Sequence, residues 1–196
     1  MLVMPIYLAS ASPRRQELLR QIGVSFEVLI PNINEAQRAG ELPDAYVTRM
    51  ALEKARACHQ KVTQKNLTPY PLLAADTTVV RDHAILGKPM DRIAGEAMLA
   101  SLAGRSHEVL TAICVIHEHK IYQALSRSRV TLGVLSAREI ARYWDTGEPQ
   151  DKAGGYGLQG LAASFIARLE GSYSGVVGLP LYELMQIMRK IGWNRE

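Results

Sequence analysis

The sequence predicts an α/β protein built around a buried central strand. Segments of strand length alternate along the chain with segments whose apolar residues recur at helical spacing, a pattern typical of α/β folds. The stretch 72–80 is an almost continuous apolar run, which is typical of a strand covered on both faces. With 196 residues, 47% of them apolar, the chain can form a substantial core. We therefore expect one domain over residues 1–196.

Local patterns predict the remaining elements. Short apolar runs predict further strands at 6–9, 26–30, 108–117, 121–132 and 165–169. Apolar residues at helical spacing predict helices that begin at Pro13 and Pro43, span 93–102 and 136–144, and follow Pro180. Ser12 before Pro13 is a typical N-cap, and the Ser136-x-x-Glu139 pattern is a capping box. Only a short polar segment separates strands 108–117 and 121–132, so we expect them to form a hairpin.

Composition and charge narrow the classes of function. The formal net charge of +4 suits an anionic small ligand, but ordinary surface lysines and arginines are the commoner explanation. The basic residues are scattered and form no aromatic–basic platform, so we expect no nucleic-acid partner. No apolar run approaches the roughly 20 residues of a membrane span. The first nine residues lack the basic region of a signal peptide, and we expect a first strand there instead.

The two cysteines, Cys58 and Cys114, are too few and too far apart for a disulfide framework or a zinc site. We expect both to be reduced core thiols in a cytoplasmic protein that does not contact membranes. The five histidines show no metal-ligand spacing and no partner nucleophile, and none is assigned a role.

The segment 10–15, Ser-Ala-Ser-Pro-Arg-Arg, joins the first strand to the start of a helix. Free backbone N–H groups and the helix dipole favour an anion at such a place. Arg14 and Arg15 in the first helical turn oppose that dipole, which indicates a phosphate or carboxylate between them. The alternative is that both arginines pair with acidic groups elsewhere, such as Glu17. The segment lacks the Gly-x-x-x-x-Gly-Lys-Ser/Thr spacing of a P-loop, so it is not one.

Two charged residues interrupt apolar surfaces. Lys54 follows Val47 and Met50 on the apolar stripe of its helix, so it either extends to the edge of the stripe or meets a buried anion. Asp76 lies within the apolar run 72–80, where a carboxylate costs several kcal/mol unless it is paired, hydrogen-bonded or bound to a metal. In open α/β sheets, ligands bind beyond the carboxyl ends of the strands, where a residue such as Asp76 would project. The alternative for Asp76 is a structural carboxylate that caps a neighbouring helix.

Two further segments carry residues suited to ligand binding. Lys88 lies on a Gly-Lys-Pro turn shortly after the central strand, where an exposed lysine is also ordinary. The loop 147–160 is rich in glycines, which would let the backbone approach a flat ligand closely. Gln159 offers a donor and an acceptor for a base edge. The alternative for this loop is a mobile surface segment without a ligand.

Seven segments in order resemble motifs of the Maf family of nucleotide pyrophosphatases. They are Leu8-Ala-Ser-Ala-Ser-Pro-Arg-Arg, Glu53-Lys-Ala, Ala75-Asp-Thr, Gly87-Lys-Pro, Ser106-His-Glu-Val-Leu-Thr, Asp151-Lys-Ala-Gly-Gly-Tyr-Gly-Leu-Gln-Gly and Val177-Gly-Leu-Pro. Each motif is weak alone, but the ordered set covers essentially the whole chain. The resemblance implies an elongated mixed β-sheet flanked by helices, with two lobes around a central cleft, similar to inosine triphosphatases.

The resemblance also implies an activity, a cofactor and roles for individual residues. Members split a nucleoside triphosphate into the monophosphate and pyrophosphate with a divalent cation, Mg²⁺ or Mn²⁺, and are often dimeric, so a homodimer is a candidate assembly. Asp76 matches the proton acceptor. Positions tied to substrate choice are Arg14, Thr77 and Gln159, and positions on the phosphate side are Ser10, Arg15, Lys54 and Lys88. Glu35, together with Asp76, is the candidate metal ligand.

The Ala75-Asp-Thr and Gly-Tyr-Gly-Leu-Gln-Gly motifs resemble the branch of the family that acts on dTTP and UTP, and modified pyrimidine nucleotides are further candidate substrates. Two alternatives stay open. One is the branch that acts on 7-methyl-GTP, which usually carries Ser-Asp-Gln in place of Ala-Asp-Thr. The other is a nucleotide-binding regulator of cell division without catalysis, which would share every binding residue.

Overall fold

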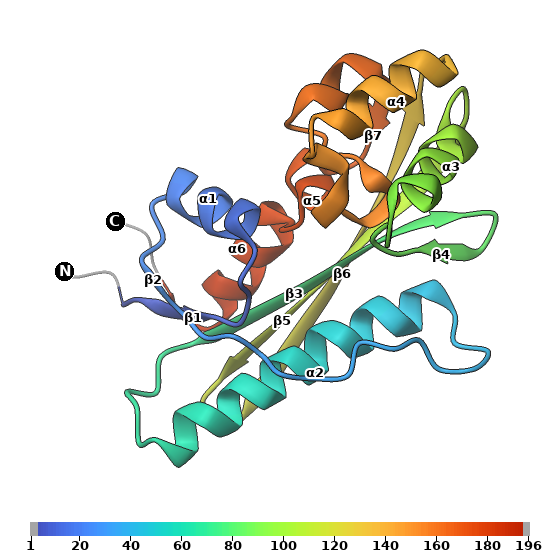
Figure 1. The fold of residues 1–196 in the computed structure, drawn as a ribbon. Coiled ribbons are helices and arrows are strands. Elements are labelled where there is room, and N and C mark those ends of the chain that lie inside the picture. The colour runs from blue at the N-terminus through green and yellow to red at the C-terminus, as the bar shows by residue number, and fades with distance from the viewer. Residues whose placement is uncertain (1–3, 194–196) are drawn as a thin grey trace.

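A computed structural model describes residues 4–193, so the first three residues of the expected N-terminal strand region lie outside the described residues. The structure confirms an α/β fold, with one mixed seven-stranded sheet in the order β2-β1-β3-β5-β6-β7 and β4 paired to β3. The molecule is elongated, and helices lie on both faces of the sheet (Figure 1).

The elements follow the predicted order along the chain. The strands are β1 (Ile6–Leu8), β2 (Phe26–Val28), β3 (Leu72–Arg81), β4 (Ala84–Leu86), β5 (Ser106–His117), β6 (Lys120–Leu132) and β7 (Ile166–Glu170). The helices are α1 (Pro13–Gln21), α2 (Pro43–Gln64), α3 (Arg92–Leu102), α4 (Ala137–Asp145), α5 (Tyr173–Val177) and α6 (Leu181–Lys190). The glycine-rich segment forms short 3₁₀ turns at Glu148–Asp151 and Ala153–Gly155, and a third follows at Leu161–Phe165. Sequence patterns missed β4, α5 and these turns.

The sheet is parallel at one end and antiparallel at the other. β1 pairs in parallel with β2 and β3, whereas β3 pairs antiparallel with β5 from Leu72↔Ile116 to Val80↔Glu108. β5 and β6 form the predicted hairpin, paired from Ser106↔Thr131 to His117↔Lys120. Strand β3 is therefore central, as its apolar run predicts.

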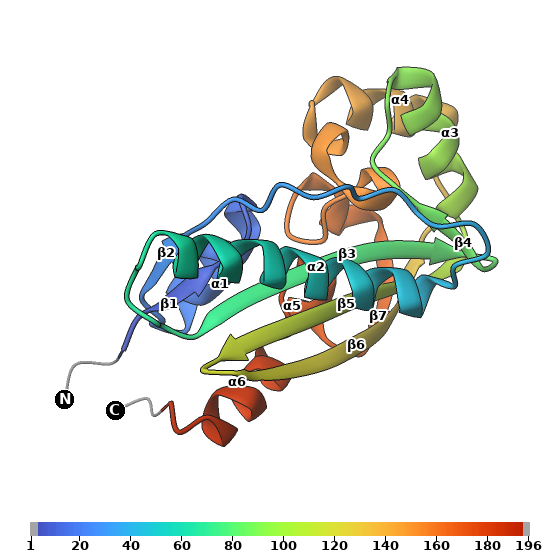
Figure 2. The ribbon, with the colours of Figure 1, turned by 90° about the horizontal axis from the view of Figure 1, so that it is seen from below.

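Three apolar clusters fill the space between the sheet and the helices. Helix α2 covers one face of β3 and β5 (Figure 2). Helices α1 and α6 cover the other face near β1, and α3 and α4 pack around the far end of β5 and β6. Along β3, Ala74 belongs to the α2 side and Ala75 to the α1 side. This alternation places Asp76 and Thr77 on opposite faces of the sheet.

Local signals for the helix boundaries are largely confirmed. Ser136 and Glu139 form the predicted capping box. Ser12 takes the N-cap position of α1, with proline next to it, but its side chain makes no capping hydrogen bond. Both cysteines are buried and free, as expected. Among residues 4–193, no helix is both long enough and apolar enough to cross a membrane.

Candidate functional site

A cleft of about 630 Å³ lies beside β3, between the end that carries β1 and the end that carries α3 and α4. Its walls come from segments far apart in the sequence: 9–15, 76–79, 85–88, 151–153, 156–159 and 176–178, with single residues from the loop before α2 and from α2 itself. All nine predicted site residues line this cleft: Ser10, Arg14, Arg15, Glu35, Lys54, Asp76, Thr77, Lys88 and Gln159.

The cleft lies beside a stretch of the β3 edge between the residues that pair with β1 and those that pair with β4. On this side β1 pairs only with Leu72 and Leu73, and β4 pairs only from Val79 onward. Ala9 donates its N–H to Leu73 O at 2.7 Å, after which the chain leaves the sheet. Because alternate residues of a strand direct their backbone groups to the same edge, residues 75 and 77 direct theirs into this gap.

Asp76 and Lys54 form a buried ion pair at the cleft wall. Lys54 Nζ lies 2.7 Å from Asp76 Oδ1 and 2.9 Å from Glu35 Oε2. Lys54 and Asp76 are 7% and 6% exposed, so the lysine does not reach for solvent, and the alternative of a buried anion is the correct one. Burial raises the pKa of Asp76, while the charges of Lys54 and Arg15 oppose that rise. A carboxylate with a raised pKa is a suitable general base.

Arg15 is held by neutral acceptors. Its Nε donates to Gly178 O at 2.8 Å, Nη1 to Ser10 Oγ at 3.1 Å and Nη2 to Thr77 Oγ1 at 3.3 Å. Burial lowers the pKa of Arg15 and the nearby Asp76 raises it, and a guanidinium stays charged in proteins. Its positive charge is thus oriented at the cleft without a hydrogen-bonded carboxylate among residues 4–193, which favours an anionic ligand.

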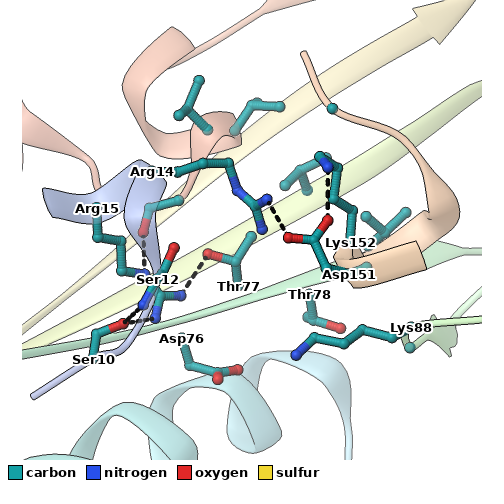
Figure 3. A pocket seen from close by; sticks show the side chains of 18 of the residues that line it. Ser10, Ser12, Arg14, Arg15, Asp76, Thr77, Thr78, Lys88, Asp151 and Lys152 are labelled. Atoms are coloured by element: carbon teal, nitrogen blue, oxygen red, sulfur yellow. Dashed lines mark hydrogen bonds and ion pairs between the residues drawn. The ribbon is translucent and has the colours of Figure 1, made fainter. Parts of the chain in front are cut away.

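Arg14 does pair with an acidic group, but the partner is Asp151 and not Glu17. Arg14 Nη1 lies 3.2 Å from Asp151 Oδ2, and Lys152 Nζ lies 2.6 Å from Asp151 Oδ1. Glu17 is 3.5 Å from Arg20 instead. Figure 3 shows Asp151 between the two cations at the wall of the cleft. Sequence reasoning gave Asp151 and Lys152 no individual role, although their charges stand directly before the glycines.

Lys88 follows β4 and Gln159 belongs to the loop 156–159, and both line the cleft. Both side chains are exposed, and Lys88 extends toward the space near Asp76 and Thr78 (Figure 3). Within the described part of the chain, neither side chain makes a hydrogen bond to another residue. Both are therefore free to contact a ligand in the cleft.

The glycines of the loop 147–160 have a packing role that the sequence interpretation missed. A methyl group on Gly154 would lie 2.9 Å from the Val79 side chain, and one on Gly157 would lie 2.7 Å from the Lys152 side chain. A methyl group on Gly160 would overlap the Glu148 carboxylate. Residues 154–158 are buried, so the loop is not a loose surface segment. Gly157 also lines the cleft, so close approach of a ligand to the backbone of this loop stays a prediction beside this packing role.

The carboxylates of the cleft suit a cation that arrives with a phosphate. Residues 4–193 contain no group of three or more His, Cys, Asp or Glu side chains that could hold a metal. The carboxylates of Asp76 and Glu35 nevertheless both form ion pairs with Lys54. Mg²⁺ is commonly bound by one or two carboxylates together with substrate phosphates. The two carboxylates therefore fit a cation that is also held by substrate phosphates. They do not fit a cation held by protein side chains alone.

The fold and the cleft define an α/β protein with a cation-lined cleft beside a buried carboxylate. Residues 5–191 match the family described as Maf-like protein, and the chain belongs to this family.

Two relatives that are about half identical to this chain support this assignment. The "dTTP/UTP pyrophosphatase" of Bordetella avium (strain 197N) is 50% identical over 191 residues, which cover 95% of each chain. A protein of the same name from Methylobacillus flagellatus is 51% identical, covering 95% of this chain and 92% of the relative. Among solved structures, the Staphylococcus aureus Ham1 protein has a TM-score of 0.43 at 14% identity, covering 65% of this chain and 71% of that one. Protein VC0702 from Vibrio cholerae has a TM-score of 0.40 at 12% identity, covering 95% and 99%.

Proposed function

We propose that this protein is a cytoplasmic nucleoside triphosphate pyrophosphatase that hydrolyses dTTP and UTP to the monophosphate and pyrophosphate. The observation that carries the proposal is the buried Asp76, held at 2.7 Å by Lys54 in a cleft that also presents Arg15 and Lys88. The substrate in this proposal is taken from the names of two relatives. Both relatives are about half identical to this chain over nearly its whole length. We propose that residues 1–196 act as one domain.

In this proposal, residues that line the cleft carry out each step of the reaction. Arg15 and Lys88 hold phosphate oxygens, and Ser10 keeps Arg15 in place through its 3.1 Å hydrogen bond. Asp76 accepts a proton from a water whose oxygen attacks a phosphorus of the α–β anhydride. When the α-phosphorus is attacked, its bond to the bridging oxygen opposite the water breaks, and pyrophosphate leaves with the bonding electron pair. Such reactions depend mainly on positioning and charge neutralisation, which explains several cations around one base.

Lys54 and Glu35 complete this arrangement. Lys54 opposes the rise in the pKa of Asp76 that burial causes, and so favours the ionised form of this carboxylate. Asp76 and Glu35 would hold a Mg²⁺ or Mn²⁺, which neutralises phosphate charge when bound. Arg14 and Gln159 lie at the cleft wall next to the loop 151–159, and we assign them to recognition of the nucleoside.

A pyrophosphate-release screen tests the proposal. The purified chain is mixed with canonical and modified nucleoside triphosphates and with 7-methyl-GTP, each with Mg²⁺, with Mn²⁺ and with a chelator. We expect release of pyrophosphate from dTTP and UTP that depends on the cation. A preference for 7-methyl-GTP would reject the substrate assignment. Binding of nucleotides without turnover would favour the regulator.

A further inference from the structure

The segment around Gln159 forms a short arch in the wall of the cleft. Residues 157–161 have the sequence Gly-Leu-Gln-Gly-Leu, so Gln159 carries the only polar side chain among them, and this side chain is exposed. Gly157, Leu158 and Gln159 line the cleft. Gly160 N–H donates to Gly157 O at 3.1 Å, which closes a turn with Gln159 inside it. Residues 157–161 are called the Gln159 arch below.

The carboxylate of Glu148 holds one end of the Gln159 arch. Its Oε2 atom accepts from Leu161 N–H at 2.8 Å, and its Oε1 atom accepts from Ala162 N–H at 3.4 Å. A methyl group on Gly160 would overlap this carboxylate, so the carboxylate lies directly against the backbone of the arch. Glu148 itself does not line the cleft. Any effect of Glu148 on a ligand therefore passes through the arch.

The same carboxylate holds the other end of the arch through Tyr143. This tyrosine lies in α4 and is 3% exposed. Its hydroxyl donates to Glu148 Oε1 at 2.7 Å and accepts from Gly157 N–H at 3.2 Å. Burial raises the pKa of Glu148, but the hydrogen bonds from Leu161 and Tyr143 outweigh this and lower it overall. The ionised carboxylate and the backbone N–H fix the direction of both bonds, because the first only accepts and the second only donates.

Hydrogen bonds to a loop also stabilise proteins that have no ligand, so these bonds alone indicate no function. Their placement on both sides of Gln159 does. The backbone is held before and after this residue, whereas the Gln159 side chain faces the cleft wall with no hydrogen-bond partner among residues 4–193. A side chain on a fixed backbone loses less freedom when it binds a ligand, and this strengthens binding.

We propose that Glu148 is a positioning residue that holds Gln159 in place for a nucleotide in the cleft, by fixing both ends of the Gln159 arch. This inference rests on the proposed function, because the ligand is the nucleoside triphosphate of that proposal. Glu148 thus acts on the binding of the substrate, and the proton transfer belongs to Asp76.

A double-mutant cycle tests the coupling between Glu148 and Gln159. The probe is α,β-methylene dTTP with Mg²⁺, which cannot be hydrolysed between its α and β phosphorus atoms. Calorimetry gives its dissociation constant for the wild type, Glu148→Ala, Gln159→Ala and the double variant. Each single substitution should raise this constant about tenfold, the effect of one hydrogen bond. The double variant should bind no more weakly than Gln159→Ala, because Glu148 then has no side chain left to position.

Two results of the cycle would overturn the inference. One is a wild-type dissociation constant in Glu148→Ala, and the other is a double variant about tenfold weaker than Gln159→Ala. If circular dichroism shows Glu148→Ala unfolded, Tyr143→Phe takes its place, because it frees only the Gly157 end of the arch. It should raise the dissociation constant about threefold, and an unchanged constant would likewise contradict the inference.

Glu139→Ala is the matched control. Glu139 is another carboxylate that accepts from a backbone N–H near α4, that of Ser136 at 2.7 Å, but it does not line the cleft or contact the arch. This variant should lose stability through its capping box and keep the wild-type dissociation constant. A weaker constant in Glu139→Ala would show that loss of stability alone explains the effect of Glu148→Ala.

Two further measurements separate this inference from the proposed function. Hydrogen exchange of residues 157–162 needs no nucleotide and should be faster in Glu148→Ala than in the wild type; equal exchange would reject the inference alone. In dTTP hydrolysis by Glu148→Ala, the loss in kcat/KM should fall on KM, and a loss confined to kcat would reject it too. A wild type that binds the probe but releases no pyrophosphate from dTTP rejects the proposed hydrolysis and leaves the cycle valid. If the wild type does not bind the probe, both proposals fail.

Discussion

Acidification should destabilise this fold through His107, a β5 residue outside the proposed chemistry. His107 is 4% exposed, its Nε2 lies 2.6 Å from Tyr156 Oη, and its Nδ1 has no partner among residues 4–193. Burial lowers the pKa of His107 from 6.5 to about 4. The folded protein therefore holds a neutral imidazole at pH values where the unfolded chain already binds a proton.

The sign and size follow from proton linkage. Between pH 6.5 and about 4 the unfolded state binds more protons, so stability falls as the pH falls. Each pH unit within this window is worth up to about 1.4 kcal/mol. Lowering the pH from about 7 to about 5 crosses roughly 1.5 units of the window, and His107 should contribute a loss of about 2 kcal/mol.

Urea unfolding at the two pH values measures this loss. The His107→Gln variant cannot gain the proton, so its free energy of unfolding should fall by about 2 kcal/mol less than that of the wild type. His119→Gln is the control, because His119 is exposed beside the β5–β6 turn, and it should behave like the wild type. If His107→Gln loses as much stability on acidification as the wild type, the assignment of the effect to His107 is refuted.

Three further perturbations test the site and its supporting loop. Asp76→Asn should lower pyrophosphate release about 10²- to 10⁴-fold while nucleotide affinity, measured by calorimetry, persists; near-normal release would reject Asp76 as the base. Lys54→Met removes the charge that opposes the burial-driven rise in the pKa of Asp76, so the acidic limb of kcat/KM should move to higher pH, and an unmoved limb would contradict this coupling. Gly160→Ala should cost about 1–3 kcal/mol in thermal unfolding because its methyl overlaps the Glu148 carboxylate. Gly87→Ala meets open space and should cost less, and equal costs would contradict the packing argument.

Periodicity was sufficient to predict the long elements, because each presents many residues in one pattern. The buried strand β3, the helix α2 and the β5–β6 hairpin all belong to this class. The β4 strand has three residues and α5 has five, too few for a period to be read. Such short elements depend on tertiary contacts for their stability. α5 nevertheless supplies Val176 and Val177 to the lining of the cleft, so the sequence left out part of its wall.

The site was predictable where a polar residue breaks an apolar pattern. Asp76 stands out in its strand, and Lys54 stands out on the apolar stripe of its helix, although the pattern could not decide between solvent and a buried partner. The two residues are 22 positions apart, and only the packing of α2 on β3 brings them together. The same holds for Arg14 and Asp151, 137 positions apart.

The open edge of β3 resolves an apparent conflict in the geometry of the site. Neighbouring residues of a strand point to opposite faces of a sheet, and Asp76 meets Lys54 on one face whereas Thr77 meets Arg15 on the other. Inside a fully paired sheet, no single cleft could reach both side chains. Here β1 ends its pairing at Leu73 and β4 begins at Val79, so a ligand can approach the edge and contact both faces. This arrangement lets one strand present both Asp76 and Thr77 to the cleft from adjacent positions.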